Sequence, residues 1–138
     1  MVALKSWKRI PEHYRYVIVG GGGVLLGWVI YNLIFWLNPL EQNRATTSWF
    51  VAYFLAIIRQ HALHYHLTFS SSEKTYFESL TGAFGAYGIG WIITTVANGI
   101  IMTRFTSNHN IAFFATLCIG VLLNYFLLRK LAFTSHPN

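Results

Sequence analysis

The sequence predicts an all-α membrane protein in which four transmembrane helices form two tandem helical hairpins, with both termini on the cytoplasmic side. Two observations carry this prediction. Long stretches without charged residues fill most of the 138-residue chain, and the basic residues gather at its ends and in its middle loop. A helix needs about 20 apolar residues to cross the hydrocarbon of a bilayer. A transmembrane barrel would instead show many short alternating segments, and this chain has none.

Each predicted span is defined by its composition. The first and third spans contain no Asp, Glu, Lys or Arg, and neither does the central part of the fourth, residues 111–128. The second span is interrupted by Arg59, but it opens with the apolar run Trp49–Leu55. The connections are short and leave no segment for a soluble catalytic domain, so we expect one domain over residues 1–138. The four predicted spans cover about residues 16–37, 47–67, 80–103 and 110–131.

The orientation follows from the positive charges, because Lys and Arg are enriched in cytoplasmic loops. Only Arg44 and Arg104 lie in the two loops that this rule places outside. The positive charges behind the net charge of +6 therefore set the orientation of the chain in the membrane and attract anionic lipids. The net charge does not indicate binding to nucleic acid. Leu4, Trp7 and Ile10 alternate with basic residues, which suits either a short interfacial helix or a disordered basic leader. The basic residues on the expected cytoplasmic side are Lys5, Lys8, Arg9, Arg15, Lys74, Arg129 and Lys130.

A pattern of small residues and amides relates the two halves of the chain. Small residues at three- and four-residue spacing let helices approach closely in lipid. The second span ends with a side-chain amide, Gln60, followed nine residues later by a Phe, and the fourth span repeats this from Asn124. The sequence thus predicts a parallel repeat of two hairpins. The small residues expected at helix contacts are Gly20, Gly23, Gly27, Gly82, Ala86 and Gly90, and the first and third spans each carry an Asn in the outer half, Asn32 and Asn98.

Arg59 is the most costly residue of the predicted spans, since a charge near a helix centre costs about 2.5–3.5 kcal/mol on insertion scales. Arg59 lies about eight residues above the expected cytoplasmic boundary, so snorkelling toward the interface softens that cost without removing it. We expect the polar groups of this region just inside the cytoplasmic headgroup level. A regular helix would place His66 on the same face. At that depth guanidinium forks and amides suit the phosphate of a lipid carrier. The predicted phosphate-binding residues are Arg15, Arg59, Arg129 and Lys130; simple topology anchoring is the alternative, and we favour it for Lys130.

Other kinds of chemistry are poorly supported by the residue types. His61, His64 and His66 invite a metal site, but His66 points away from the other two and the chain has no Asp, so we expect no metal. No nucleophile–base set or carboxylate pair is recognisable, so we expect neither an enzyme nor a cofactor. A small-cation exporter is a further alternative, although four-helix transporters of that class use a Glu within the first span and Glu12 lies just before it. The single Cys118 forms no disulfide and is expected to be packed.

Two motifs at the ends of the chain resemble those of GtrA-like membrane proteins. They are Arg15-Tyr16-Val17-Ile18-Val19-Gly20 and Asn124-Tyr125-Phe126-Leu127-Leu128-Arg129-Lys130-Leu131-Ala132-Phe133. The spans of that family begin Arg-Phe-x-x-x-Gly and end near Asn-Phe-x-x-Asn-Arg-x-Trp-x-Phe. The resemblance extends from Arg15 to Phe133, and the second half keeps the pattern better than the first. In the first hairpin Gln60 stands for the Asn, Tyr65 stands where the Arg is expected, and Leu67 and Leu131 replace the usual Trp.

The resemblance implies a multi-pass protein of the prokaryotic cytoplasmic membrane that flips a polyprenyl-phosphate-linked sugar for cell-surface polysaccharide synthesis or glycosylation. It also implies a separately encoded glycosyltransferase partner. Because four thin helices enclose little volume, we expect a homo-oligomer or a partner complex. The alternative is a non-transporting accessory subunit that positions the glycosyltransferase. The residues expected to offer the sugar hydroxyls a polar path between the hairpins are Gln60, His61, His64, Asn124, Tyr125, Asn32 and Asn98.

Overall fold

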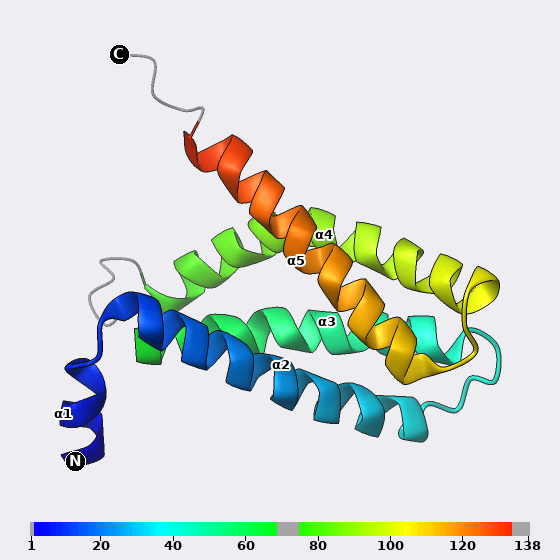
Figure 1. The fold of residues 1–138 in the computed structure, drawn as a ribbon, viewed down its shortest axis with the longest axis horizontal. Coiled ribbons are helices and arrows are strands. Elements are labelled where there is room, and N and C mark those ends of the chain that lie inside the picture. The colour runs from blue at the N-terminus through cyan, green and yellow to red at the C-terminus, as the bar shows by residue number, and fades with distance from the viewer. Residues whose placement is uncertain (1, 69–74, 134–138) are drawn as a thin grey trace.

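The structure is a computed structural model that describes residues 2–68 and 75–133, with side chains described within 5–67 and 75–124 (Figure 1). Every secondary-structure element in these ranges is helical. In chain order the elements are α1 (Val2–Lys8), α2 (Glu12–Leu37), α3 (Arg44–Leu63), the π-helical turn η1 (His64–Thr68), α4 (Tyr76–Arg104) and α5 (His109–Phe133).

Local sequence signals explain where the helices begin and end. Pro11 precedes α2, and Asn38 ends it in an extended conformation because the following Pro39 disfavours helix. A reciprocal capping box between Thr75 and Glu78 starts α4. The Asn108 side chain accepts from the backbone amides of Asn110 and Ile111, at 2.9 and 3.3 Å, and so caps the start of α5.

The helices pack mainly against their sequence neighbours. The principal contacts join α2 to α3, α3 to α4, and α4 to α5. Figure 1 shows α5 crossing the other helices obliquely, so that its C-terminal half extends away from them. Where α5 begins, it also meets the second half of α2: Trp28 Nε1 donates to Asn110 Oδ1 at 3.0 Å, and the Phe35 ring stacks on that of His109 with centroids 3.7 Å apart. The bundle is therefore closed at the end where α2 stops and α5 starts.

The buried core lies at this closed end. Tyr31, Trp49, Ala52 and Phe113 form a cluster from α2, α3 and α5. Beside it, four polar side chains are completely shielded from solvent, and each is hydrogen-bonded. Asn98 joins three helices: Thr46 Oγ1 donates to its Oδ1 at 3.2 Å, and its Nδ2 donates to Thr116 Oγ1 at 3.0 Å. The polar set is Ser48, Thr94, Asn98 and Thr116.

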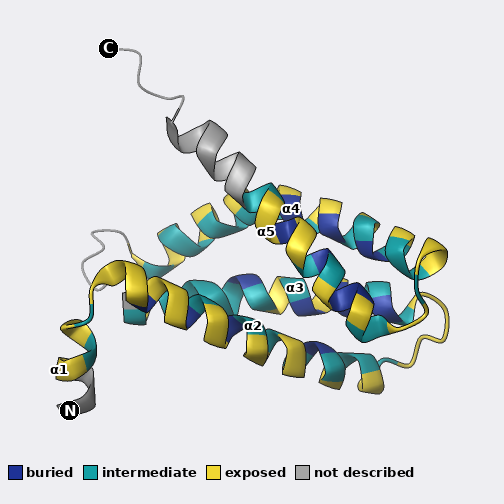
Figure 2. Cartoon of the chain, viewed as in Figure 1, coloured by how far each residue is buried: buried dark blue, intermediate teal, exposed yellow. Residues whose placement is uncertain are grey.

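The outer surfaces of the helices are apolar and exposed, as expected of helices in lipid (Figure 2). Within the described part of the chain, α2 and α4 are the helices long and apolar enough to cross a membrane, whereas the apolar part of α5, His109–Asn124, is shorter. The helical fold is as predicted, while the four spans and their orientation stay predictions. Cys118 is exposed on α5, so the expectation that it is packed is wrong.

Replacing Asn98 tests the polar contact between α3, α4 and α5. We expect Asn98→Ala to lower the free energy of unfolding by about 1–3 kcal/mol, because Thr46 and Thr116 lose their shared partner in a dry interior. Thermal unfolding in detergent micelles, followed by circular dichroism, measures the effect. Thr103→Val is the control, since the Thr103 hydroxyl donates only to carbonyls of its own helix. Equal losses in the two variants would contradict the interhelical role.

Candidate functional site

Arg59 reaches from α3 onto the backbone of α2. Its Nη2 donates to the carbonyl oxygen of Gly23 at 3.0 Å. A Cβ atom on Gly27 would lie 3.1 Å from the same nitrogen, so the missing side chain makes room for the guanidinium. The remaining nitrogens, Nε and Nη1, are buried and have no hydrogen-bond partner among the described residues. Arg59 thus holds two unsatisfied donors inside the helix packing.

The guanidinium of Arg59 lies at the level of the middle of α2. Gly23 and Gly27 lie near the middle of α2, whose range is Glu12–Leu37. Side chains on a helix tilt toward its N-terminus, and here that direction leads away from the expected cytoplasmic end. How deep Arg59 lies relative to the membrane surface stays a prediction. Its charge sits at the level of the middle of the first predicted span.

Gln60 packs beside Arg59 against the same stretch of α2. A Cβ on Gly23 would collide with the Gln60 side-chain oxygen, and it would lie 3.0 Å from Cδ. Gln60 Nε2 is 2.8 Å from His64 Nε2, and the His64 ring stacks on Tyr16 with centroids 4.8 Å apart. Gly23 therefore seats the amide that the sequence analysis singled out, and Tyr16 joins this group as a residue that the sequence analysis did not identify.

The second half of the chain repeats this seating of an amide on a glycine. A Cβ on Gly90 of α4 would lie 3.3 Å from Asn124 Oδ1 of α5 and 3.2 Å from the Tyr53 hydroxyl. Tyr53 and Asn124 are joined by a side-chain hydrogen bond. Tyr53 lies seven residues before Gln60, which is the helical spacing of a shared face, so periodicity could have identified it.

Arg15 lies apart from Arg59. It is buried, and its Nη1 donates to the Leu67 carbonyl at 3.1 Å, while Trp7 Nε1 donates to the same oxygen at 3.0 Å. The Arg15 Nε is buried without a partner in the described part of the chain. Eight residues separate Arg15 from Gly23, or about 12 Å of helix rise, so the two guanidinium groups sit at different depths. α1 is tied to this end of the bundle through Trp7.

The histidines at the end of α3 divide between two neighbours. His61 Nε2 is 3.0 Å from Ser79 Oγ on α4, whereas His64 faces Gln60 and α2. His66 is exposed, and its ring stacks with that of Tyr76 at 6.1 Å, so it does not share the surroundings of Arg59. Among the described residues no group of three potential ligands that could hold a metal comes together.

The other predicted polar residues lie far along the bundle or outside the described side chains. Asn32 Oδ1 is 3.1 Å from His109 Nε2, and Asn98 is bonded to two threonines, so both amides are engaged by protein at the closed end. They do not join Gln60 in a continuous polar surface. Three predicted residues have side chains that lie outside the described part of the chain: Tyr125, Arg129 and Lys130.

The predicted small-residue contacts fall into two groups. Gly23, Gly27 and Gly90 each have a side chain of another helix close to the position of a Cβ. Gly20 and Gly82 have no described atom within 4 Å of that position, and Ala86 is exposed. Among the described residues, side chains of another helix therefore approach the first group and not the second.

A family model described as GtrA/DPMS, transmembrane domain, matches residues 15–133. No curated protein and no solved structure matches the chain.

The contact between Gly23 and Gln60 can be tested by adding a methyl group at one glycine at a time. Gly23→Ala is expected to push the Gln60 side chain off α2, because its Cβ would overlap the Gln60 oxygen. Gly20→Ala is the matched control, since open space surrounds it. Both changes raise helix propensity by up to about 1 kcal/mol, so their difference reports the contact. We expect the unfolding midpoint of Gly23→Ala to fall below that of Gly20→Ala; indistinguishable midpoints would contradict the close seat.

Proposed function

Because this chain belongs to the GtrA/DPMS transmembrane-domain family, we propose that it translocates the head group of a polyprenyl-phosphate-linked sugar across the membrane. The family places the chain among membrane proteins of polyprenyl-phosphate sugar metabolism. Flipping as the specific activity is our inference, and it extends to a role in cell-surface polysaccharide synthesis or glycosylation. The proposed setting is the prokaryotic cytoplasmic membrane, with four spans and both termini inside.

The single observation that carries this proposal is the position of Arg59. Its guanidinium is at mid-helix depth, and two of its nitrogens lack a partner among the described residues. A group that needs an anion at that depth is suited to a phosphate that must pass through the membrane. A residue that only anchored the protein to the cytoplasmic headgroups would have no reason to lie so deep.

Arg15 supplies a second phosphate-binding position for the proposed transfer, at a shallower level than Arg59. It lies nearer the basic α1, and its Nε is also buried without a described partner. Since the two guanidiniums are separated along α2, we propose that they hold the phosphate in succession. Arg129 and Lys130 remain candidates for the entry end by their place in the sequence.

The amide side chains of Gln60 and Asn124 suit the hydroxyl groups of the sugar. Gln60 lies beside Arg59 and packs against Gly23, and Asn124 packs against Gly90 in the same way. Amides both donate and accept hydrogen bonds, as sugar hydroxyls do. We propose that the sugar passes between the hairpins along these residues while the prenyl chain stays in lipid. The open faces around Gly20 and Gly82 offer close-packing surfaces for a second copy or for a glycosyltransferase.

One observation favours the accessory-subunit alternative. Figure 1 shows α1 turning away from α2 at the N-terminal end of the chain, and its residues Lys5 and Lys8 are exposed together with the following Arg9. A cationic surface of this kind suits docking of a partner or of anionic lipid. If this were the main function, loss of these charges would matter more than loss of Arg59.

The proposal predicts that Arg59 is needed for head-group transfer. Purified protein is placed in liposomes with a polyprenyl-phosphate sugar, and the rate at which the head becomes accessible in the opposite leaflet is measured. We expect wild type to accelerate transfer and Arg59→Ala to reduce the acceleration by about tenfold or more, which corresponds to about 1.4 kcal/mol or more. Arg59→Lys should rescue only in part, because a point charge replaces a fork.

Arg104→Ala is the control, because it removes the same charge from an exposed position. No acceleration by wild type over protein-free liposomes, across several sugars, would reject the flippase proposal. Dependence of glycosyltransferase binding on Lys5, Lys8 and Arg9, without any transfer, would then support the accessory role.

A further inference from the structure

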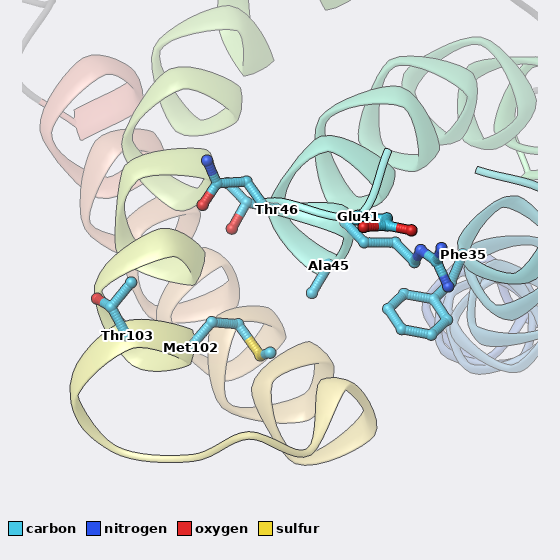
Figure 3. A pocket seen from close by; sticks show the side chains of 8 residues that line it. Phe35, Glu41, Ala45, Thr46, Met102 and Thr103 are labelled. Atoms are coloured by element: carbon cyan, nitrogen blue, oxygen red, sulfur yellow. The ribbon is translucent and has the colours of Figure 1, made fainter. Parts of the chain in front are cut away.

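A pocket with a volume of about 440 Å³ opens at the closed end of the bundle (Figure 3). Figure 3 shows Met102 and Thr103 on one side of it, Phe35 and Glu41 on the other, and the start of α3 between them. Its volume falls in the range of about 300–1,000 Å³ found for small-molecule sites. The orientation expected from the positive charges puts this pocket on the outer face, opposite to α1.

Opposite charges line the pocket without neutralising each other. Glu41 and Arg44 are both lining residues, yet their side chains form no ion pair within the described part of the chain. Arg44 is held by other contacts: its Nε donates to the Leu40 carbonyl at 3.0 Å, and its guanidinium carbon lies 5.8 Å from the centre of the Phe35 ring. The guanidinium is thereby positioned while its terminal nitrogens stay available to a ligand.

Each threonine hydroxyl in the pocket is oriented by a hydrogen bond that it donates within the protein. Thr46 Oγ1 donates to Asn98 Oδ1 at 3.2 Å, and Thr103 Oγ1 donates to the Gly99 carbonyl at 2.8 Å. Each hydroxyl oxygen keeps lone pairs that can accept from a ligand. The Asn43 amide, also at the pocket, can both donate and accept. The lining therefore offers both donors and acceptors, together with the apolar Phe35 and Met102.

We infer that this pocket binds a neutral monosaccharide, namely the sugar head of the lipid-linked substrate after it has crossed. The inference rests on the proposed function and names the outer site of the same substrate. A polyhydroxyl ring uses the carboxylate, the guanidinium, the amide and the hydroxyls at once, because each sugar hydroxyl donates and accepts. A phosphate would be disfavoured by the Glu41 carboxylate. The Arg59 region is the opposite case, since among the described residues it presents a guanidinium with no contacting carboxylate.

The test measures sugar binding directly, without any transport. Saturation-transfer NMR is recorded on the full-length protein in nanodiscs with millimolar methyl α-glucoside, methyl α-mannoside or methyl α-galactoside. At least one glycoside is expected to bind, and Glu41→Ala or Arg44→Ala should weaken it by about tenfold. Thr103→Trp, which fills the pocket, should abolish it. Arg104→Ala, next to the pocket but not lining it, should bind as wild type does.

The outcomes separate this inference from the flippase proposal. Absence of binding by all three glycosides, or binding unaffected by Thr103→Trp, would overturn the outer sugar site. Displacement of the glycoside by inorganic phosphate in wild type but not in Arg44→Ala would overturn the choice of a neutral ligand. Pocket-dependent glycoside binding without head-group transfer would retain the sugar site and reject flipping. Head-group transfer without glycoside binding in the pocket would retain the flippase proposal and reject the sugar site.

Discussion

The contact between the Arg59 guanidinium and the Gly23 carbonyl is the constraint on which the inner part of the structure depends. A guanidinium can approach the backbone of another helix only where that helix lacks side chains, and Gly23 and Gly27 provide this. The same two glycines set the spacing of α2 and α3, and Gln60 fills the space beside Arg59. A side chain at Gly23 would therefore disturb the packing and the polar group together.

The internal repeat of the sequence corresponds to a repeated contact between an amide side chain and a glycine. In each half, the amide near the end of the second helix lies against a glycine of the helix before it, Gln60 on Gly23 and Asn124 on Gly90. The neighbours of the two amides differ. Gln60 adjoins a guanidinium and an imidazole, whereas Asn124 bonds to the Tyr53 hydroxyl. The two halves thus share a packing rule while presenting different chemistry, and within the described side chains a guanidinium lies beside the amide in the first half only.

Sequence reasoning reached the helical class and the family, because composition and motifs encode them directly. It did not reach the direction in which Arg59 points, since a long side chain can extend either way along a helix and only the neighbouring glycines decide. The π-helical turn η1 was also missed. One extra residue per turn leaves no mark in hydrophobic periodicity, yet it changes where His66 lies. The contact of Trp7 with Leu67 is equally hidden, because it joins segments sixty residues apart through a backbone carbonyl.

The way in which Arg59 is held also bears on how it exchanges partners. The Gly23 carbonyl lies within α2, where a regular helix already supplies it with the amide of Gly27, so Arg59 uses the second lone pair of that oxygen. In the proposed transfer the guanidinium would turn to a phosphate, and the carbonyl would keep its helical hydrogen bond, so no buried acceptor would lose its only partner. The incoming phosphate can satisfy Nε and Nη1, which now lack partners among the described residues. Under the proposed function, this exchange gives partners to donors that lack one among the described residues, and it creates no unsatisfied acceptor, so the acceptor side costs nothing whichever partner Arg59 holds.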